Sequence, residues 1–106
     1  MKLGIIISTK DAETAWNAFR LANFSLKEGD NVSVFLIGKG VECQSASTEL
    51  FNVKAQVESF IDDGGMILAC GTCMETRQQS ETKMCPFSTL KDLHTIIKES
   101  NTVITF

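Results

Sequence analysis

Continuous runs of apolar residues recur along the chain and predict the strands of a sheet. The runs are rich in β-branched residues and do not alternate with polar ones, which is typical of parallel strands covered on both faces. Glycine or polar residues bound each run. We therefore expect four buried strands of a parallel sheet, at residues 3–7, 32–37, 66–69 and 102–106.

The segments between these runs carry apolar residues at helical spacing. Leu50, Leu90 and Ile97 are among the side chains expected to point inward from such helices. Asp11 and Glu13 suit the first turn of the first helix, since acidic side chains are favourable near a helix N-terminus. The predicted helices run from Ala12 to residues 27–29, from about residue 47 to 62 and from Ser88 or Thr89 to residues 100–101, with a short helical turn near residues 73–79.

Alternation of strands and helices with short joints predicts right-handed crossovers. The expected fold class is α/β, a three-layer α/β/α sandwich with a mostly parallel sheet of four to five strands. The chain has 106 residues, of which 43% are hydrophobic, enough for one core but not for two. No repeat or linker interrupts the pattern, so residues 1–106 are expected to form a single domain.

The charge balance argues against several classes of partner. Lys and Arg total 10 against 13 Asp and Glu, for a net charge of −3. This offers no basic surface for direct binding of nucleic acid or of an anionic membrane. No apolar run approaches the ~20 residues of a membrane-spanning helix. Polar residues follow the first apolar run too soon for a signal peptide, so we expect a cytoplasmic location.

Four cysteines carry the most specific chemical information: Cys43, Cys70, Cys73 and Cys85. A chain with this core and no secretory signal is expected to use cysteine for redox chemistry, sulfur chemistry or metal binding rather than as a disulfide framework. In an open parallel sheet, ligands bind beyond the carboxyl ends of the strands. Cys70-Gly71-Thr72-Cys73 follows the third predicted strand, which places a Cys-x-x-Cys at that edge.

Reactivity at this edge has a physical basis, because the thiolate is the nucleophile and its pKa falls beside helix N-termini and cations. Gly71 permits a tight turn after Cys70. The amides beyond it are then expected to point toward a sulfur anion. Cys70 and Cys73 are the candidate catalytic residues. The candidate residues for binding the substrate around them are Lys10, Gly38, Lys39, Gly71, Thr72, Arg77 and Cys85.

Other interpretations of the cysteines stay open. Free cysteine is often simply a buried core residue, which is the alternative for Cys70 and Cys73 and the expectation for Cys43. Cys85 fits either a core residue or a resolving thiol. Cys70 and Cys73 also form a zinc half-site, but a second pair is missing and His94 or other cysteines would have to complete it. We expect no metal and no cofactor.

The chain resembles the DsrE/DsrF-like family of sulfur-relay proteins over nearly its whole length. The most specific part is the cysteine loop with the C-terminal helix and strand. The segments that carry the resemblance are 36–42 (LIGKGVE), 67–73 (ILACGTC), 84–86 (MCP), 88–93 (STLKDL) and 102–106 (TVITF).

This resemblance implies a parallel α/β sandwich that assembles as a homotrimer or hexamer. It also implies that Cys70 carries a persulfide, received from a sulfur donor and passed to an acceptor, each a protein or a small thiol. The sequence departs from the family pattern in two ways. A second cysteine follows at Cys73, and Arg77 alone stands for a basic Arg-Arg-Gly ending.

Two functions from different classes follow. The first is a persulfide carrier or sulfurtransferase, in which Cys70 attacks a donor persulfide. The alternative is a dithiol/disulfide redox or regulatory module that uses the Cys70–Cys73 pair. A non-catalytic oligomeric scaffold is a third possibility.

Overall fold

The elements alternate between strands and helices along the chain. The computed structural model describes residues 1–82 and 85–106, so Met84 of the MCP segment lies outside the described residues. In chain order the elements are β1 (Lys2–Ile7), α1 (Ala12–Lys27), β2 (Asn31–Leu36), the 3-10 helix η1 (Gly38–Ser45), α2 (Val53–Asp62), β3 (Met66–Cys70), α3 (Gly71–Thr76), β4 (Phe87–Ser88), α4 (Leu90–Glu99) and β5 (Thr102–Thr105).

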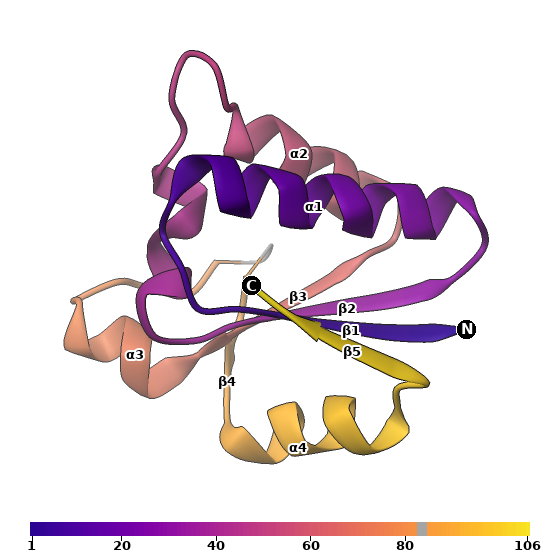
Figure 1. Cartoon of the computed structure of the whole chain (residues 1–106). Helices are drawn as coiled ribbons and strands as arrows, with labels where there is room; N and C mark the ends of the chain where they lie inside the picture. The colour runs from indigo at the N-terminus through magenta and orange to yellow at the C-terminus, as the bar shows by residue number, and fades with distance from the viewer. Residues whose placement is uncertain (83–84) are drawn as a thin grey trace.

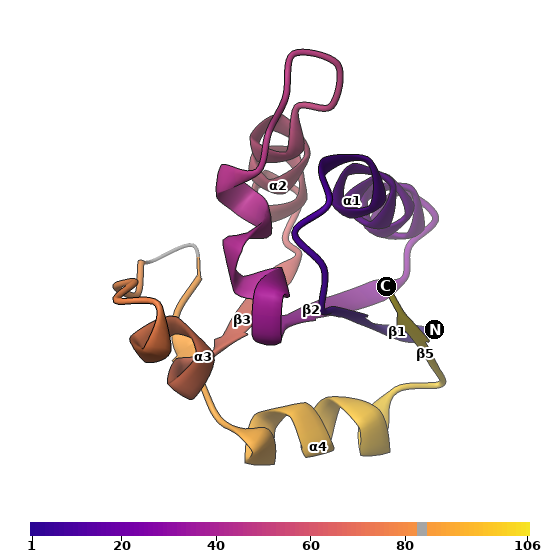
Figure 2. The same ribbon diagram turned by 60° about the vertical axis from the view of Figure 1, so that its left-hand side comes forward.

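A parallel sheet of five strands forms the middle layer, with the strand order β4-β3-β2-β1-β5. α1 and α2 lie side by side over one face, and α4 lies across the other (Figure 1). A second view shows the sheet between these two helical layers (Figure 2). The predicted three-layer α/β/α sandwich is confirmed. No helix in the described part of the chain is both long and apolar enough to cross a membrane.

All four apolar runs form strands, but their burial differs from the prediction at the C-terminus. β5 is an edge strand that pairs only with β1, and both Thr102 and Thr105 are exposed. The prediction of a buried strand is therefore wrong for β5. The two-residue β4 pairs with β3 at the opposite edge and was not predicted, because two residues carry no periodic pattern.

Polar side chains cap the N-termini of α1 and α2. Asp11 accepts a hydrogen bond from the Thr14 amide and starts α1. Asn52 does the same for the Ala55 amide, so α2 begins at Val53 and not near residue 47 as predicted. The predicted inward position of Leu50 is wrong, because it lies in the loop before this cap with 77% of its surface exposed.

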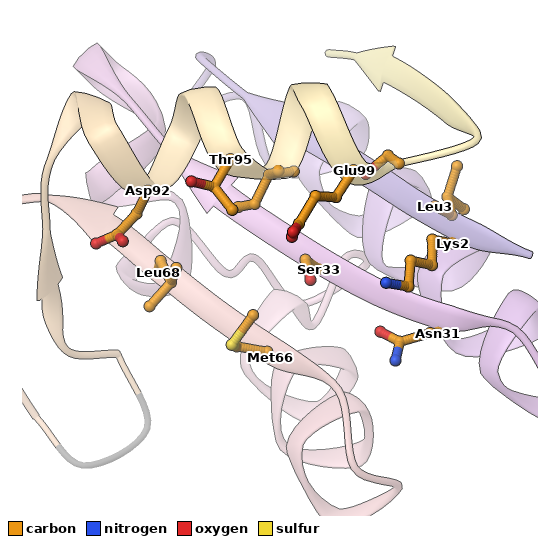
Figure 3. A pocket seen from close by; sticks show the side chains of 11 residues that line it. Lys2, Leu3, Asn31, Ser33, Met66, Leu68, Asp92, Thr95 and Glu99 are labelled. Carbon is orange, nitrogen blue, oxygen red and sulfur yellow. The ribbon is translucent and has the colours of Figure 1, made fainter.

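α4 is less buried than its apolar spacing predicts. Ile96 is buried against the sheet, but Leu90 and Ile97 are exposed, so their predicted inward positions are wrong. Because α4 alone covers this face of the sheet, it lacks the neighbouring helix that would bury its flanks. A cavity of about 450 Å³ lies beside it, where Met66, Leu68 and Ser33 of the sheet face α4 (Figure 3).

η1 was expected as a loop and instead packs tightly over the end of β1. The Ile37 amide donates to the Ile7 carbonyl over 3.0 Å, and a Cβ at Gly40 would lie only 1.9 Å from that same oxygen. Backbone atoms approach this closely only where a side chain is absent, so glycine is required at this position. This contact fixes η1 above the carboxyl ends of the strands.

Candidate functional site

The carboxyl ends of β2 and β3 lie next to each other and bring two loops together. The parallel register pairs Leu36 with Ala69, so the chain after Leu36 lies beside the chain after Ala69. β3 ends at Cys70, and α3 begins at the next residue with Cys70 as its N-cap. Cys73 follows within the first turn of α3. The predicted helical turn near residues 73–79 is therefore present, but it begins earlier.

Gly71 lets this turn pack against β4. A Cβ at Gly71 would lie 3.3 Å from the Ser88 carbonyl oxygen and 3.5 Å from the Phe87 Cβ. The sequence predicted a conformational reason for this glycine, whereas the structure gives a steric one. The short β4 strand, itself paired with Ala69 and Cys70, leaves little room for a side chain there.

The sulfur atoms of Cys70 and Cys73 have different surroundings. The Gly38 amide, at the start of η1, donates a hydrogen bond to Cys73 Sγ over 3.3 Å. Cys70 is 8% exposed and packs with Phe35 and Ile96 between the sheet and α4. Cys73 is half-buried and contacts apolar residues on both faces of the sheet. The Gly38 amide therefore lies beside the Cys73 sulfur, and its role in binding the substrate stays a prediction.

Burial is the largest influence on the Cys70 thiol and raises its pKa. A hydrogen bond with the Cys73 side chain and the charge of a Cys73 thiolate also raise it. The backbone amides of Cys73 and Thr72 lower it, but they do not prevail. The predicted lowering of the Cys70 pKa is wrong, because the aromatic and aliphatic cover removes more solvation than two amides restore.

Arg77 is engaged in a different interaction from the predicted one. Its Nε atom lies 2.9 Å from Glu42 Oε2, and one of its terminal nitrogens donates to the Cys73 carbonyl oxygen over 3.1 Å. Its charge is thus balanced by Glu42, and it connects α3 to η1. Glu42 was not among the predicted site residues, although it follows the end of β2 at the same edge of the sheet.

The two lysines and Thr72 are at the surface. Lys10 lies between β1 and α1, Lys39 lies in η1, and Thr72 is the second residue of α3. Among residues 1–82 and 85–106, no hydrogen bond or ion pair fixes either lysine side chain. Their predicted roles beside the substrate stay predictions.

Cys43 and Cys85 lie in the other apolar core, between the sheet and the layer of α1 and α2. Burial raises the pKa of Cys43 to about 12, with a further contribution from the nearby Cys85, and raises that of Cys85 to about 11. Cys85 also lines a pocket of about 240 Å³ together with Gln44 and Met74. Cys70 belongs to a different cluster from Cys85, and the resolving role of Cys85 stays a prediction.

A metal centre needs several ligating side chains gathered around one ion. Within residues 1–82 and 85–106, no three His, Cys, Asp or Glu side chains converge as ligands of one ion. His94 is exposed on α4, well separated in the chain from the cysteine loop.

Comparisons with known proteins agree with this architecture. The model of the DsrE/DsrF-like family matches residues 1–106. Uncharacterized protein MJ0989 of Methanocaldococcus jannaschii is 31% identical over 114 residues, covering 100% of both chains. Uncharacterized protein MK0008 of Methanopyrus kandleri is 35% identical over 100 residues, covering 89% of this chain and 83% of that protein.

Two solved structures share the fold at 20% sequence identity. The crystal structure of the ychN protein from E. coli superposes with a TM-score of 0.85 and covers 100% of both chains. The structure of the conserved protein BT1422 from Bacteroides thetaiotaomicron has a TM-score of 0.82 and covers 99% of this chain and 94% of that one.

The raised pKa of Cys43 predicts a loss of stability at alkaline pH. The thiol ionises near 9 in the unfolded chain but only near 12 in the folded one. The contribution of the protonated Cys43 thiol to the free energy of unfolding is therefore complete below pH 9 and is lost as the pH rises toward 12. At pH 10.5 this amounts to about 2 kcal/mol of unfolding free energy. Urea unfolding at pH 8 and pH 10.5 measures the loss. Because the pKa of Cys85 is also raised, to about 11, Cys43→Ala should remove only part of the wild-type pH dependence.

Val57→Ala is the matched control for that measurement, because Val57 is equally buried and does not titrate. It is expected to lower stability at both pH values through the cavity it creates, while keeping the wild-type pH dependence. A pH dependence in Cys43→Ala as steep as in the wild type would contradict the assignment.

Proposed function

Because the chain belongs to the DsrE/DsrF-like family, we propose that it is a persulfide-carrying sulfur-relay protein or sulfurtransferase whose Cys70–Cys73 pair accepts and passes on sulfur. One observation carries this proposal. Cys70 ends β3 at the carboxyl edge of the sheet, Cys73 lies in the first turn of the helix that follows, and the Gly38 amide donates to the Cys73 sulfur. Amide donors stabilise a thiolate or a persulfide anion without competing for the transferred sulfur.

The reaction is an exchange of one sulfur atom between thiols. A thiolate of the pair attacks the outer sulfur of a donor persulfide R–S–SH, forming Cys–S–SH and releasing R–S⁻. An acceptor thiolate then attacks the outer sulfur of Cys–S–SH, which restores the cysteine thiolate and leaves the acceptor as its persulfide. The donor and the acceptor are proteins or small thiols, and reducing conditions in the cytoplasm would keep the free thiols available.

A dithiol/disulfide redox or regulatory module is the second candidate. The placement of Cys70 as the N-cap of α3 and of Cys73 within its first turn favours it, because a Cys-x-x-Cys pair at the start of a helix is the arrangement of dithiol redox sites. In this case the pair loses two electrons and two protons to an oxidised thiol partner, which is reduced, and no sulfur is carried.

Persulfide loading separates the two candidates. The reduced protein is treated with inorganic polysulfide, freed of small molecules and measured by intact mass spectrometry. Sulfur relay predicts a gain of one sulfur atom, removable by dithiothreitol and transferable to an added thiol, in the wild type or in a single variant, Cys70→Ser or Cys73→Ser, that lacks the second thiol able to release it as sulfide. The double variant Cys70→Ser/Cys73→Ser should not load, whereas Cys43→Ala/Cys85→Ala should load as the wild type does.

A loss of two hydrogen atoms, with no added sulfur under any condition, would contradict the relay and favour the redox module. Equal loading of the Cys70→Ser/Cys73→Ser variant and the wild type would contradict both, because the sulfur would then reside outside the pair.

We also propose that the protein assembles as a homotrimer or hexamer through the face that bears α4. Leu90 and Ile97 of α4 and Met66 of β3 expose 66%, 48% and 47% of their surface on this face. Met66 also lines the cavity between α4 and β3 (Figure 3), whereas Leu90 and Ile97 lie on α4 outside that lining. A second copy of the chain is the proposed cover.

Light scattering after size exclusion tests this assembly at micromolar concentration. The wild type should have three or six times the mass of the 11.6 kDa chain, and Met66→Glu/Leu90→Glu should be a monomer. Phe24→Glu is the control, because Phe24 is 62% exposed on α1, on the opposite face of the sheet. A monomeric wild type, or dissociation by Phe24→Glu alone, would contradict the proposal.

A further inference from the structure

We propose that Cys73, and not Cys70, is the thiol that first accepts sulfur, and that Cys70 is the resolving thiol. This inference rests on the proposed function and assigns separate roles within the pair. The family resemblance assigns the persulfide to Cys70, whereas the contacts of the two side chains favour the reverse order.

Access to the sulfur atoms is the first argument. An incoming donor must approach the attacking sulfur along the S–S bond that will break, so this sulfur needs an open side. Cys70 lies in the strand, with only 8% of its surface exposed beneath Phe35 and Ile96. Cys73 lies within the first turn of α3 and is half-buried, above the ends of β2 and β3. A donor therefore meets Cys73 first.

Stabilisation of charge is the second argument. The Gly38 amide donates to Cys73 Sγ over 3.3 Å. Burial raises the pKa of the Cys70 thiol and keeps it protonated to a higher pH than a free thiol. Negative charge on the Cys73 sulfur would be stabilised by the Gly38 amide.

The position of the Gly38 amide is itself held by η1. Gly38 has a φ of +57°, in the left-handed region that side chains other than glycine rarely adopt. The Arg77 guanidinium holds Glu42 of η1 and the Cys73 carbonyl at the same time. Arg77 therefore connects η1, which carries the Gly38 amide, to α3, which carries the Cys73 sulfur, and holds these two groups in position relative to each other.

A sequence of reactions follows from the roles of Cys73 as acceptor and Cys70 as resolving thiol. The Cys73 thiolate attacks the outer sulfur of R–S–SH, which forms Cys73–S–SH and releases R–S⁻. If no acceptor arrives, Cys70 loses its proton and attacks the Cys73 sulfur of that persulfide. This forms the Cys70–Cys73 disulfide and releases HS⁻, so the carried sulfur is reduced while the two cysteines are oxidised. An external dithiol reduces the disulfide and is itself oxidised.

Limiting alkylation with iodoacetamide, followed by fragment-ion mapping, tests the order of reactivity without any sulfur donor. Cys73 is expected to be labelled at least about tenfold faster than Cys70, because its side chain is the more accessible of the two and the Gly38 amide donates to its sulfur. Gly38→Ala should slow labelling of Cys73. Gly29→Ala is the matched control, since Gly29 also has a positive φ but lies at the far end of α1, and it should leave the rate unchanged.

Treatment of the single variants with inorganic polysulfide tests the roles in sulfur transfer. Cys70→Ser should hold one sulfur atom on Cys73 and release no sulfide, whereas Cys73→Ser should load much more slowly than the wild type. Faster labelling of Cys70, or full-rate loading of Cys73→Ser, would overturn the inference while leaving the proposed function intact. If no form of the protein loads sulfur, the proposed function fails, and the order of alkylation still decides which thiol is the reactive one.

Discussion

The parallel register of β2 and β3 is the constraint on which the candidate site depends. Pairing of Leu36 with Ala69 brings the start of η1 beside the start of α3, although 35 residues separate Gly38 from Cys73. The hydrogen bond between the Gly38 amide and the Cys73 sulfur is the direct result. A shift of the register by one residue would turn the inward side chains of β3 outward and separate these two atoms.

The uneven covering of the sheet explains why the two cysteines differ. Successive side chains of a strand point to opposite faces, so Met66, Leu68 and Cys70 share the face that carries α4. One helix is enough to bury Cys70 under Ile96 but leaves Met66 half-exposed at the other end of the strand. Cys73 escapes this burial because the chain has already left the sheet.

Periodicity and composition could predict the fold and the position of the Cys70–Cys73 loop at the carboxyl edge of the sheet, because long apolar runs and the place of loops in a parallel sheet are local or topological properties. They could not predict β4, which is too short to show a period, or the exposure of Leu50, which depends on capping by Asn52. The burial of Cys70 and the Glu42–Arg77 contact depend on segments distant in the chain, so no local pattern contains them.

A crystal structure of the Cys70→Ser variant after loading with inorganic polysulfide tests the account most directly, because this variant cannot release the carried sulfur as sulfide. The account predicts one additional sulfur atom bonded to Cys73 Sγ, within hydrogen-bonding distance of the Gly38 amide. An additional sulfur bonded to Cys43 or Cys85, or a Cys73 side chain directed away from Gly38, would contradict it.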